Sequence, residues 1–183
     1  RRLGPMQVFA PGKLFVIGEY AVLDGCDAIV AAVSHGVSCS VLSGNEVQTP
    51  SGDTRFVDAA LQAVKAPPRA YRFQTWRPLD VDHKVGLGSS AAACVAAAAA
   101  GLLARQQDPM ESALQAALDA HFEVQGSGSG RDVMASFFGG LSHFSDGKRS
   151  GLSPLPLTVI HSGEPAQTGI RVKAYQALKE RSL

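Results

Sequence analysis

Two glycines and two serines stand immediately before a long alanine-rich run, in the segment Val85-Gly86-Leu87-Gly88-Ser89-Ser90-Ala91. Glycine lets a backbone pass close to a bound group and take positive φ. The free N–H groups at a helix start, with the helix dipole behind them, favour an anion. The serine hydroxyls can cap the helix, bind a phosphate oxygen or ligate Mg²⁺. By itself the segment is compatible with a phosphate site, but a glycine-serine helix entry more often reflects simple helix capping. No lysine follows the last glycine, so the pattern is not a Walker A loop.

The elements around this segment follow from hydrophobic periodicity and turn signals. We expect strands over residues 14–17, 28–33, 37–42, 71–76, 141–144 and 157–162, and helices over residues 53–65, 89–107, 109–125, 132–138 and 168–181. Asp53 or Thr54 is the candidate cap of the first helix. Asp108, followed by Pro109, caps the third. The order of elements predicts an α+β fold with a mostly antiparallel sheet, not a Rossmann sheet.

In the third expected helix, apolar residues recur along one face. They are Met110, Ala113, Leu114, Ala117, Leu118 and Phe122. The second expected helix contains the longest apolar run, residues 91–104, which is shorter than the roughly 18 residues that suggest a membrane span. Its alanines are typical of a tightly packed, buried helix.

Composition excludes some classes of function. The chain has 183 residues, 45% hydrophobic and 18% charged, with a net charge of +1. This balance gives no reason to expect nucleic acid or a membrane as partner. Three cysteines without metal-binding spacing predict neither disulfides nor zinc, and a cytoplasmic location is expected. The chain starts without methionine and ends within an expected helix, so we expect a fragment or missing loops.

Three segments together resemble the GHMP kinase family of small-molecule kinases. Residues 10–23 read Ala-Pro-Gly-Lys-Leu-Phe-Val-Ile-Gly-Glu-Tyr-Ala-Val-Leu and resemble the first family motif. Residues 86–91, Gly-Leu-Gly-Ser-Ser-Ala, resemble the second motif. Residues 126–133, Gly-Ser-Gly-Ser-Gly-Arg-Asp-Val, resemble the segment GxxSGxD of the mevalonate and phosphomevalonate kinase branch. The three segments occur in family order.

The resemblance implies the GHMP kinase fold. Residues 1–155 would form the N-terminal ATP-binding domain, a sheet with helices of the ribosomal-protein-S5-domain-2-like type. Residues 156–183 would begin a ferredoxin-like C-terminal domain that is largely absent from this chain. The third, glycine-rich family motif of that domain does not occur here.

The resemblance also implies roles for matching residues. The catalytic residues would be Lys13, which faces the transferring phosphoryl group, and Asp132, which serves the acceptor hydroxyl; helix capping by Asp132 is the alternative. ATP would be bound by Gly86, Leu87, Gly88, Ser89, Ser90 and Ala91. Ser90 would also ligate Mg²⁺. The substrate-binding residues would be Lys13, Glu19, Tyr20, Ser129, Gly130 and Arg131. A solvated Lys13 and a buried structural Glu19 are the alternatives.

One departure concerns the metal. Mevalonate kinases have a glutamate before the catalytic aspartate that helps to hold Mg²⁺, whereas His121 stands at that point here and Glu123 lies two residues later. His121 could equally be a core residue of its helix. The passage 80–84 also lacks the serine pair expected before the second motif.

The acceptor is inferred from three details. Tyr20 after Glu19, the GSGxDV form around Asp132 and residues 161–168 favour phosphomevalonate as the acceptor, a step in isoprenoid precursor synthesis. Mevalonate is the alternative acceptor, and diphosphomevalonate decarboxylase ranks third. Arg131 and Lys84 are candidate cations for a phosphorylated acceptor. A catalytically silent GHMP-fold sensor would be expected to lose Lys13, the serine pair or Asp132, and this chain keeps them.

Overall fold

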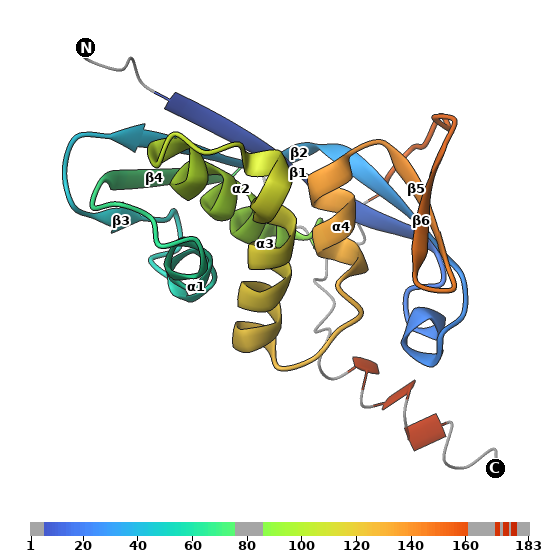
Figure 1. Cartoon of the computed structure of the whole chain (residues 1–183). Helices are drawn as coiled ribbons and strands as arrows, with labels where there is room; N and C mark the ends of the chain where they lie inside the picture. Colours follow the sequence, from blue (N-terminus) through green and yellow to red (C-terminus); the bar gives the residue numbers. More distant parts are fainter. Residues whose placement is uncertain (1–5, 76–85, 161–170, 173, 176, 179–183) are drawn as a thin grey trace.

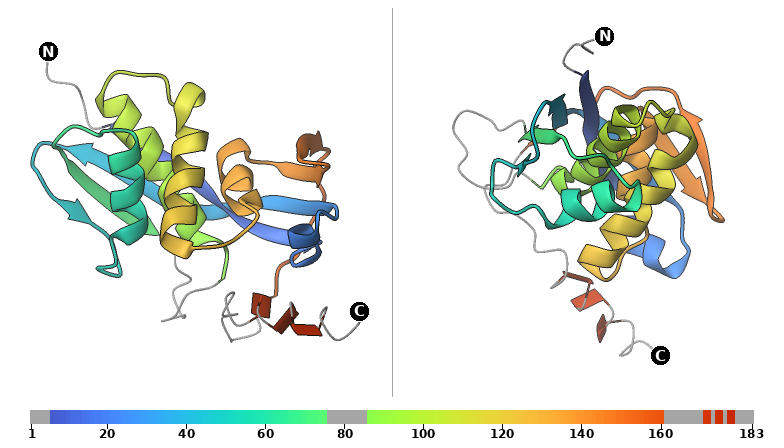
Figure 2. Two further views of the ribbon diagram at one scale, coloured as in Figure 1. Left: turned by 60° about the horizontal axis from the view of Figure 1, so that its bottom comes forward. Right: turned by 60° about the vertical axis from the view of Figure 1, so that its left-hand side comes forward.

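A mostly antiparallel sheet carries four helices on one of its faces (Figure 1 and Figure 2). This computed structural model describes residues 6–75, 86–160, 171–172, 174–175 and 177–178. The α+β class expected from the sequence is confirmed. Among the described residues, no helix is both long and apolar enough to cross a membrane.

The sheet is built around one long strand. Its strands are β1 (Met6–Ile17), β2 (Ala28–Leu42), β3 (Val47–Gln48), β4 (Ala70–Thr75), β5 (Leu141–Ser145) and β6 (Lys148–Leu152). β1 runs antiparallel along nearly the whole of β2. The other edge of β2 is shared by β4 and β5. The pairing of β3 with β4 is parallel, whereas β5 and β6 form an antiparallel hairpin.

The sequence prediction of two strands over residues 28–33 and 37–42 was wrong, because β2 is continuous. Pro11 pairs with Gly36 and Gly12 pairs with Val33, so Ser34 and His35 are extra residues on β2, a bulge. A bulge bends both strands without ending the pairing. A Cβ at Gly36 would lie 2.0 Å from the carbonyl oxygen of Ala10, so the close approach of the two strands requires glycine there.

The helices form a layer with α2 at its centre. Their bounds are α1 (Arg55–Ala63), α2 (Ser89–Ala104), α3 (Pro109–Gln125) and α4 (Arg131–Phe138). α2 contacts β1 and β2, and α1 and α3 pack against it and each other. α4 lies over β1, β2 and β5. Nearly every residue from Ala91 to Leu102 is buried, because alanine side chains let neighbouring helices approach α2 on several sides.

The predicted helix caps are resolved in detail. Asp108 caps α3, because its Oδ1 accepts a hydrogen bond of 2.9 Å from the N–H of Met110. At α1 the N-cap position is Thr54, but its side chain makes no cap bond. Asp53 instead accepts from the Arg55 N–H at 3.2 Å. The caps therefore place both helix starts within about two residues of the prediction.

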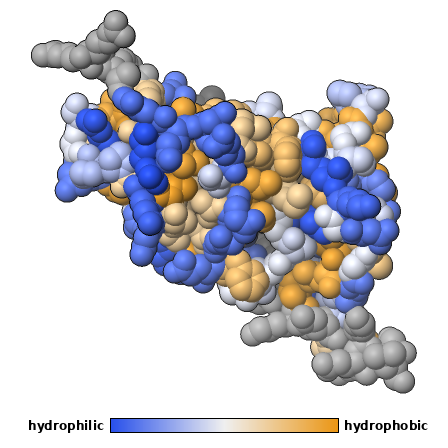
Figure 3. All heavy atoms as spheres, in the orientation of Figure 1, coloured by the Kyte–Doolittle hydropathy of each residue, from blue (hydrophilic) through white to orange (hydrophobic). Residues whose placement is uncertain are grey.

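Two other expectations need correction. The buried face of α3 is centred on Ala113, Ala117, Ala120 and His121, whereas Met110 and Phe122 are 68% and 60% exposed. Figure 3 shows apolar surface between more polar regions on this face of the molecule. Residues 157–160 form no strand.

Several expectations lie outside the described residues. They concern Trp76, the passage 80–84 with Lys84, residues 161–168 and much of the expected helix 168–181. Residues 171–172, 174–175 and 177–178 of that helix are described, and they are helical.

Candidate active site

Residues 86–90, which the sequence predicts to bind phosphate and which are called the phosphate loop below, are held against the first strand. The N–H of Lys13 donates to the carbonyl of Leu87 at 2.8 Å. A Cβ at Gly12 would lie 2.4 Å from that same carbonyl oxygen. Gly88 has a φ of 74°, and a Cβ there would lie 2.6 Å from Cγ of Lys13. Glycine at both positions therefore allows β1 and the loop to touch, and this contact brings the Lys13 side chain to the start of α2.

The start of α2 has free backbone donors. Its N-cap is Gly88, and no side chain caps the helix. The Ala92 N–H donates to the Gly88 carbonyl, so the amides of residues 89–91 precede the first bond within the helix. Helix-start amides need an acceptor from outside the helix. At α3 the Asp108 side chain provides one, whereas at α2 the described residues provide no side-chain cap. An anionic group fits this arrangement.

Ser90, His121 and Asp132 come together from three helices. Nε2 of His121 lies 3.3 Å from Oγ of Ser90 and 3.8 Å from Oδ2 of Asp132. His121 is 4% exposed. Burial lowers the pKa of its imidazole, Asp132 opposes this shift, and the charge of Lys13 adds to it. The ring is therefore neutral near pH 7, and Lys13 and Asp132 are both close enough to influence it.

Asp132 is not the N-cap of α4, because that position is Gly130. Its Oδ1 accepts from the adjacent Val133 N–H at 2.9 Å, while Oδ2 faces His121. The side chain is 21% exposed, so solvent or a ligand can still reach the carboxylate. Asp132 is therefore available for a role other than capping α4.

Two of the expected site cations rest on aromatic rings. Nζ of Lys13 lies 4.8 Å from the ring centre of Phe15, and the Arg131 guanidinium lies 5.2 Å from that of Phe144. Phe15 packs against the small buried cluster that includes Phe144. Nε of Arg131 is buried without a hydrogen-bond partner in the described part of the chain. A cation over an aromatic face is stabilised while its donors stay available.

Other expected site residues are placed further from this centre. Glu19 is exposed, which removes the alternative of a buried structural glutamate. The ring of Tyr20 stacks on Tyr175 with centroids 6.0 Å apart. Ser129 accepts from the Arg131 N–H at 3.4 Å and so shapes the turn into α4. None of these contacts joins Glu19, Tyr20 or Ser129 to the Ser90–His121–Asp132 group.

The described residues offer few metal ligands. They contain no group of three or more His, Cys, Asp or Glu side chains that could hold a metal ion. Mg²⁺ commonly binds through one or two protein oxygens together with substrate phosphates and water. The Ser90 hydroxyl and the nearby Asp132 carboxylate are oxygen donors of that kind, so a phosphate-borne Mg²⁺ fits the site.

Sequence reasoning missed the link from His121 to Ser90 and the aromatic supports of the cations. The helical spacing of His121 with Ala113 and Ala117 indicated a buried position, but not its partner. Lys13 and Phe15 lie two residues apart on β1 and therefore on the same sheet face, a signal that was available. Arg131 and Phe144 meet only through the packing of α4 on β5.

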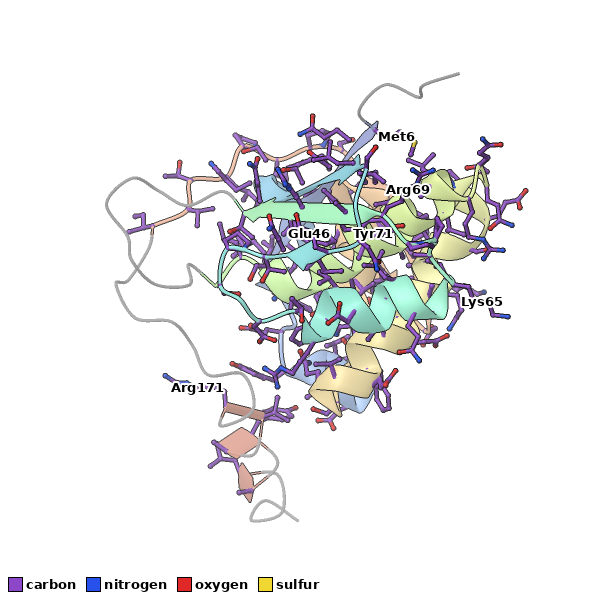
Figure 4. All side chains as sticks on the ribbon, turned by 90° about the vertical axis from the view of Figure 1, so that its left-hand side faces the viewer. Met6, Glu46, Lys65, Arg69, Tyr71 and Arg171 are labelled. Carbon is purple, nitrogen blue, oxygen red and sulfur yellow. The ribbon has the colours of Figure 1, made fainter. Side chains whose placement is uncertain are left out.

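An open hollow of about 450 Å³ lies elsewhere, where the C-terminal end of α1 meets β3 and β4. Glu46, Lys65, Arg69 and Tyr71 are among its lining residues (Figure 4). Tyr71 donates to the Pro67 carbonyl at 3.0 Å, and Glu46 pairs with Arg72 at 3.3 Å. The charges at this hollow are mixed, and these two groups are already partnered.

A comparison with models of known protein families gives a match that includes the second and third motif segments described above. Residues 56–140 match the GHMP kinases N terminal domain. Over these residues the chain carries the N-terminal domain of the GHMP kinase family. The match contains the phosphate loop, His121 and Asp132.

Similar proteins have two different names within the family. The chain is 32% identical to the mevalonate kinase of Archaeoglobus fulgidus, over 94% of this chain and 63% of that protein. It is 28% identical to the phosphomevalonate kinase of Saccharolobus solfataricus, over 74% and 48%. A crystal structure of a Lin0012 protein from Listeria innocua superimposes with a TM-score of 0.82 at 25% identity, over 97% of this chain and 66% of that one. The chain spans about half to two thirds of the length of these curated relatives.

Proposed function

We propose that this chain forms the nucleotide- and acceptor-binding part of a kinase that transfers the γ-phosphoryl group of ATP to phosphomevalonate, giving diphosphomevalonate. One observation carries the kinase assignment. The glycine-rich loop before α2 is hydrogen-bonded to the backbone of Lys13, and the helix start that follows has no side-chain cap in the described residues. His121 lies between Ser90 at that helix start and the Asp132 carboxylate. Anion donors, a cation and a carboxylate are thus adjacent, which is the set that phosphoryl transfer requires.

Each group has a distinct physical task. The amides of residues 88–90 and the serine hydroxyls would hold the nucleotide phosphates. Lys13 would offset the negative charge that develops on the transferred group. Asp132 would orient the attacking oxygen, because a phosphate nucleophile is already ionised and needs little proton removal. A bound Mg²⁺, reached by Ser90, would neutralise phosphate charge.

The choice of phosphomevalonate as the acceptor is supported by a second cationic side chain, Arg131, in addition to Lys13. A phosphate acceptor brings two clusters of negative charge together, and this repulsion is large where water is scarce. The cationic groups of Lys13 and Arg131 lie over the rings of Phe15 and Phe144, which belong to one apolar cluster. The unpartnered Nε of Arg131 leaves a donor for an anionic acceptor.

Mevalonate is the alternative acceptor, favoured by the 32% identity to a mevalonate kinase. A non-catalytic role is less well supported, because Lys13, Ser90 and Asp132 are all present and arranged together. A cytoplasmic location is part of the proposal.

The deciding experiment measures ATP consumption by the full-length protein with mevalonate and with phosphomevalonate under identical conditions. We expect a higher kcat/KM with phosphomevalonate. A clear preference for mevalonate would overturn the acceptor and leave the kinase assignment intact. No ATP consumption with any acceptor, in protein shown to be folded, would overturn both.

A further inference from the structure

His121 lies at the meeting point of three helices that carry the proposed chemistry. Ser90 is in the first turn of α2, Asp132 is in the first turn of α4, and His121 is near the end of α3. The single atom Nε2 approaches both Oγ of Ser90, at 3.3 Å, and Oδ2 of Asp132, at 3.8 Å. The Phe56 ring lies 5.4 Å from the imidazole, so an apolar contact also holds the ring in place.

The carboxylate determines where the imidazole proton sits. A neutral imidazole carries one N–H, on either Nδ1 or Nε2. A bare Nε2 would point a lone pair at the Asp132 carboxylate, and this is repulsive beside an imidazole that is only 4% exposed. A proton on Nε2 reverses the sign of that interaction and donates to Ser90.

We propose that His121 is a positioning residue whose Nε2–H donates to the Ser90 hydroxyl and attracts the nearby Asp132 carboxylate, and that it does not ligate the metal. This inference rests on the proposed function. The bond from Nε2 fixes the Ser90 side chain through one lone pair and leaves its O–H and second lone pair for a phosphate oxygen or a cation. The same N–H draws the Asp132 carboxylate toward the start of α2.

A consequence concerns the cation that the site accepts. A protonated Nε2 has no lone pair, so a divalent cation at Ser90 gains no nitrogen ligand from this atom. An all-oxygen site suits Mg²⁺ and Mn²⁺, whereas imidazole coordination would favour Zn²⁺. The two arrangements are therefore distinguishable without measuring turnover.

The first test is NMR of the histidine side chains in uniformly ¹⁵N-labelled protein. The sequence contains five histidines, and the resonances missing from His121→Gln identify those of His121. We expect the pattern of a neutral ring with the proton on Nε2, unchanged when Mg²⁺ and a non-hydrolysable ATP analogue are added. A proton on Nδ1, or an Nε2 shift that reports metal coordination when Zn²⁺ replaces Mg²⁺, would overturn the proposal. This measurement is independent of whether the protein turns over any acceptor.

The second test compares two substitutions of His121. His121→Leu removes the donor and keeps an apolar side chain, whereas His121→Gln can place an amide N–H near the position of Nε2–H. Loss of such an orienting group typically costs about 10- to 100-fold in activity. We expect His121→Leu to lower kcat by that amount with KM for the acceptor nearly unchanged, and His121→Gln to recover most of the loss.

Thermal unfolding separates positioning from a structural role. Ser136→Ala is the matched control, because Ser136 is 1% exposed on α4 and its Oγ has no partner in the described part of the chain. We expect the Tm of His121→Leu to stay close to that of the unmodified protein, since Ser90 and Asp132 are only partly buried and water can replace the lost donor. Equal loss of kcat in both His121 variants together with a lowered Tm would assign His121 to packing alone. Inactivity of the unmodified protein would count against the proposed function, and the tautomer measurement would still decide the inference.

Discussion

The backbone N–H of Lys13 donates to the carbonyl of Leu87 at 2.8 Å, so the proposed phosphate loop is anchored on the strand that carries the proposed catalytic lysine. This bond joins two segments more than 70 positions apart in the sequence. Since both partners are backbone groups, its geometry depends on how closely β1 and the loop approach. Gly12 controls that approach.

Gly12→Ala should disturb this anchor. The added Cβ would lie 2.4 Å from the Leu87 oxygen and 2.8 Å from the His35 oxygen, and both are backbone atoms that cannot rotate away. Overpacking of this kind costs about 1–3 kcal/mol. We expect a lower denaturation midpoint and weaker binding of an ATP analogue, measured by calorimetry. Gly151→Ala is the control, because nothing lies within 4 Å of a Cβ there. Unchanged nucleotide affinity in Gly12→Ala would mean that the anchor does not shape the loop.

Asp132→Asn should lower turnover without a matching change in binding. A group that acts mainly in the transition state affects kcat more than KM. Because Asp132 would orient the attacking oxygen, its loss should misplace that oxygen, and a misplacement of about 1 Å can cost about 10²-fold. Steady-state kinetics of the full-length protein measure the effect. Asp119→Asn, on the exposed side of α3, removes a carboxylate that only accepts from Gln115, and it should be neutral. A kcat for Asp132→Asn close to that of the unmodified protein would remove Asp132 from the proposed mechanism.

The sequence predicted the helices well because their signals are local. Asp108 followed by Pro109 marks the start of α3, and the alanine run marks α2. The break expected near Gly36 failed because the same residues, Ser34, His35 and Gly36, suit either a turn or a bulge. Which one forms is decided by the partner strand, where Pro11 and Gly12 bend in step with β2. β6 was missed because its residues, from Lys148 to Leu152, alternate weakly and depend on pairing with β5.

The site was predictable as a set of motifs but not as a set of contacts. Residues of the phosphate loop and Asp132 were found because glycine, serine and carboxylate patterns lie in short segments. The contact from Ser90 to His121 spans 31 positions and depends on how α2 packs on α3. That packing follows from many small alanine contacts, none of which specifies by itself which face of α3 meets the start of α2.

Asp108→Ala should destabilise the protein by about 1 kcal/mol, the usual cost of losing a helix N-cap. Asp108 accepts from the Met110 N–H at 2.9 Å, and alanine leaves that donor without a side-chain partner. Urea unfolding measures the change. Asp108→Ser should retain most of the stability, because serine also caps well. If the alanine and serine variants unfold at the same midpoint, the cap bond contributes nothing measurable.

The three cysteines should differ sharply in reactivity. Burial raises the pKa of the thiols of Cys39 and Cys94 to about 12, and both are buried, whereas Cys26 is exposed. Because the thiolate is the reactive form, the two buried thiols are almost fully protonated at pH 8. We expect a thiol reagent to label one cysteine rapidly in native protein and all three in denaturant. Rapid labelling of Cys94 in native protein would contradict the packing of α2 described above.

Arg131→Gln tests the acceptor assignment most directly. The guanidinium is held over the Phe144 ring at 5.2 Å, and its buried Nε has no partner in the described part of the chain. If Arg131 binds the acceptor phosphate, the substitution should raise KM for phosphomevalonate at least tenfold, since a hydrogen bond to a charged group is worth about 1.5–3 kcal/mol. KM for mevalonate, which lacks that phosphate, should change much less.

Arg149→Gln is the matched control for this prediction. Arg149 also rests on a phenylalanine, with its guanidinium 4.2 Å from the ring centre of Phe138, but its Nε already donates to Ser142 at 2.9 Å. Steady-state kinetics of both variants with both acceptors, at fixed ATP and Mg²⁺, give the four KM ratios. An equal rise of KM for mevalonate and phosphomevalonate in Arg131→Gln would show that Arg131 does not distinguish the acceptors. An effect of Arg149→Gln as large as that of Arg131→Gln would instead indicate a general change in the packing of α4 on the β5–β6 hairpin.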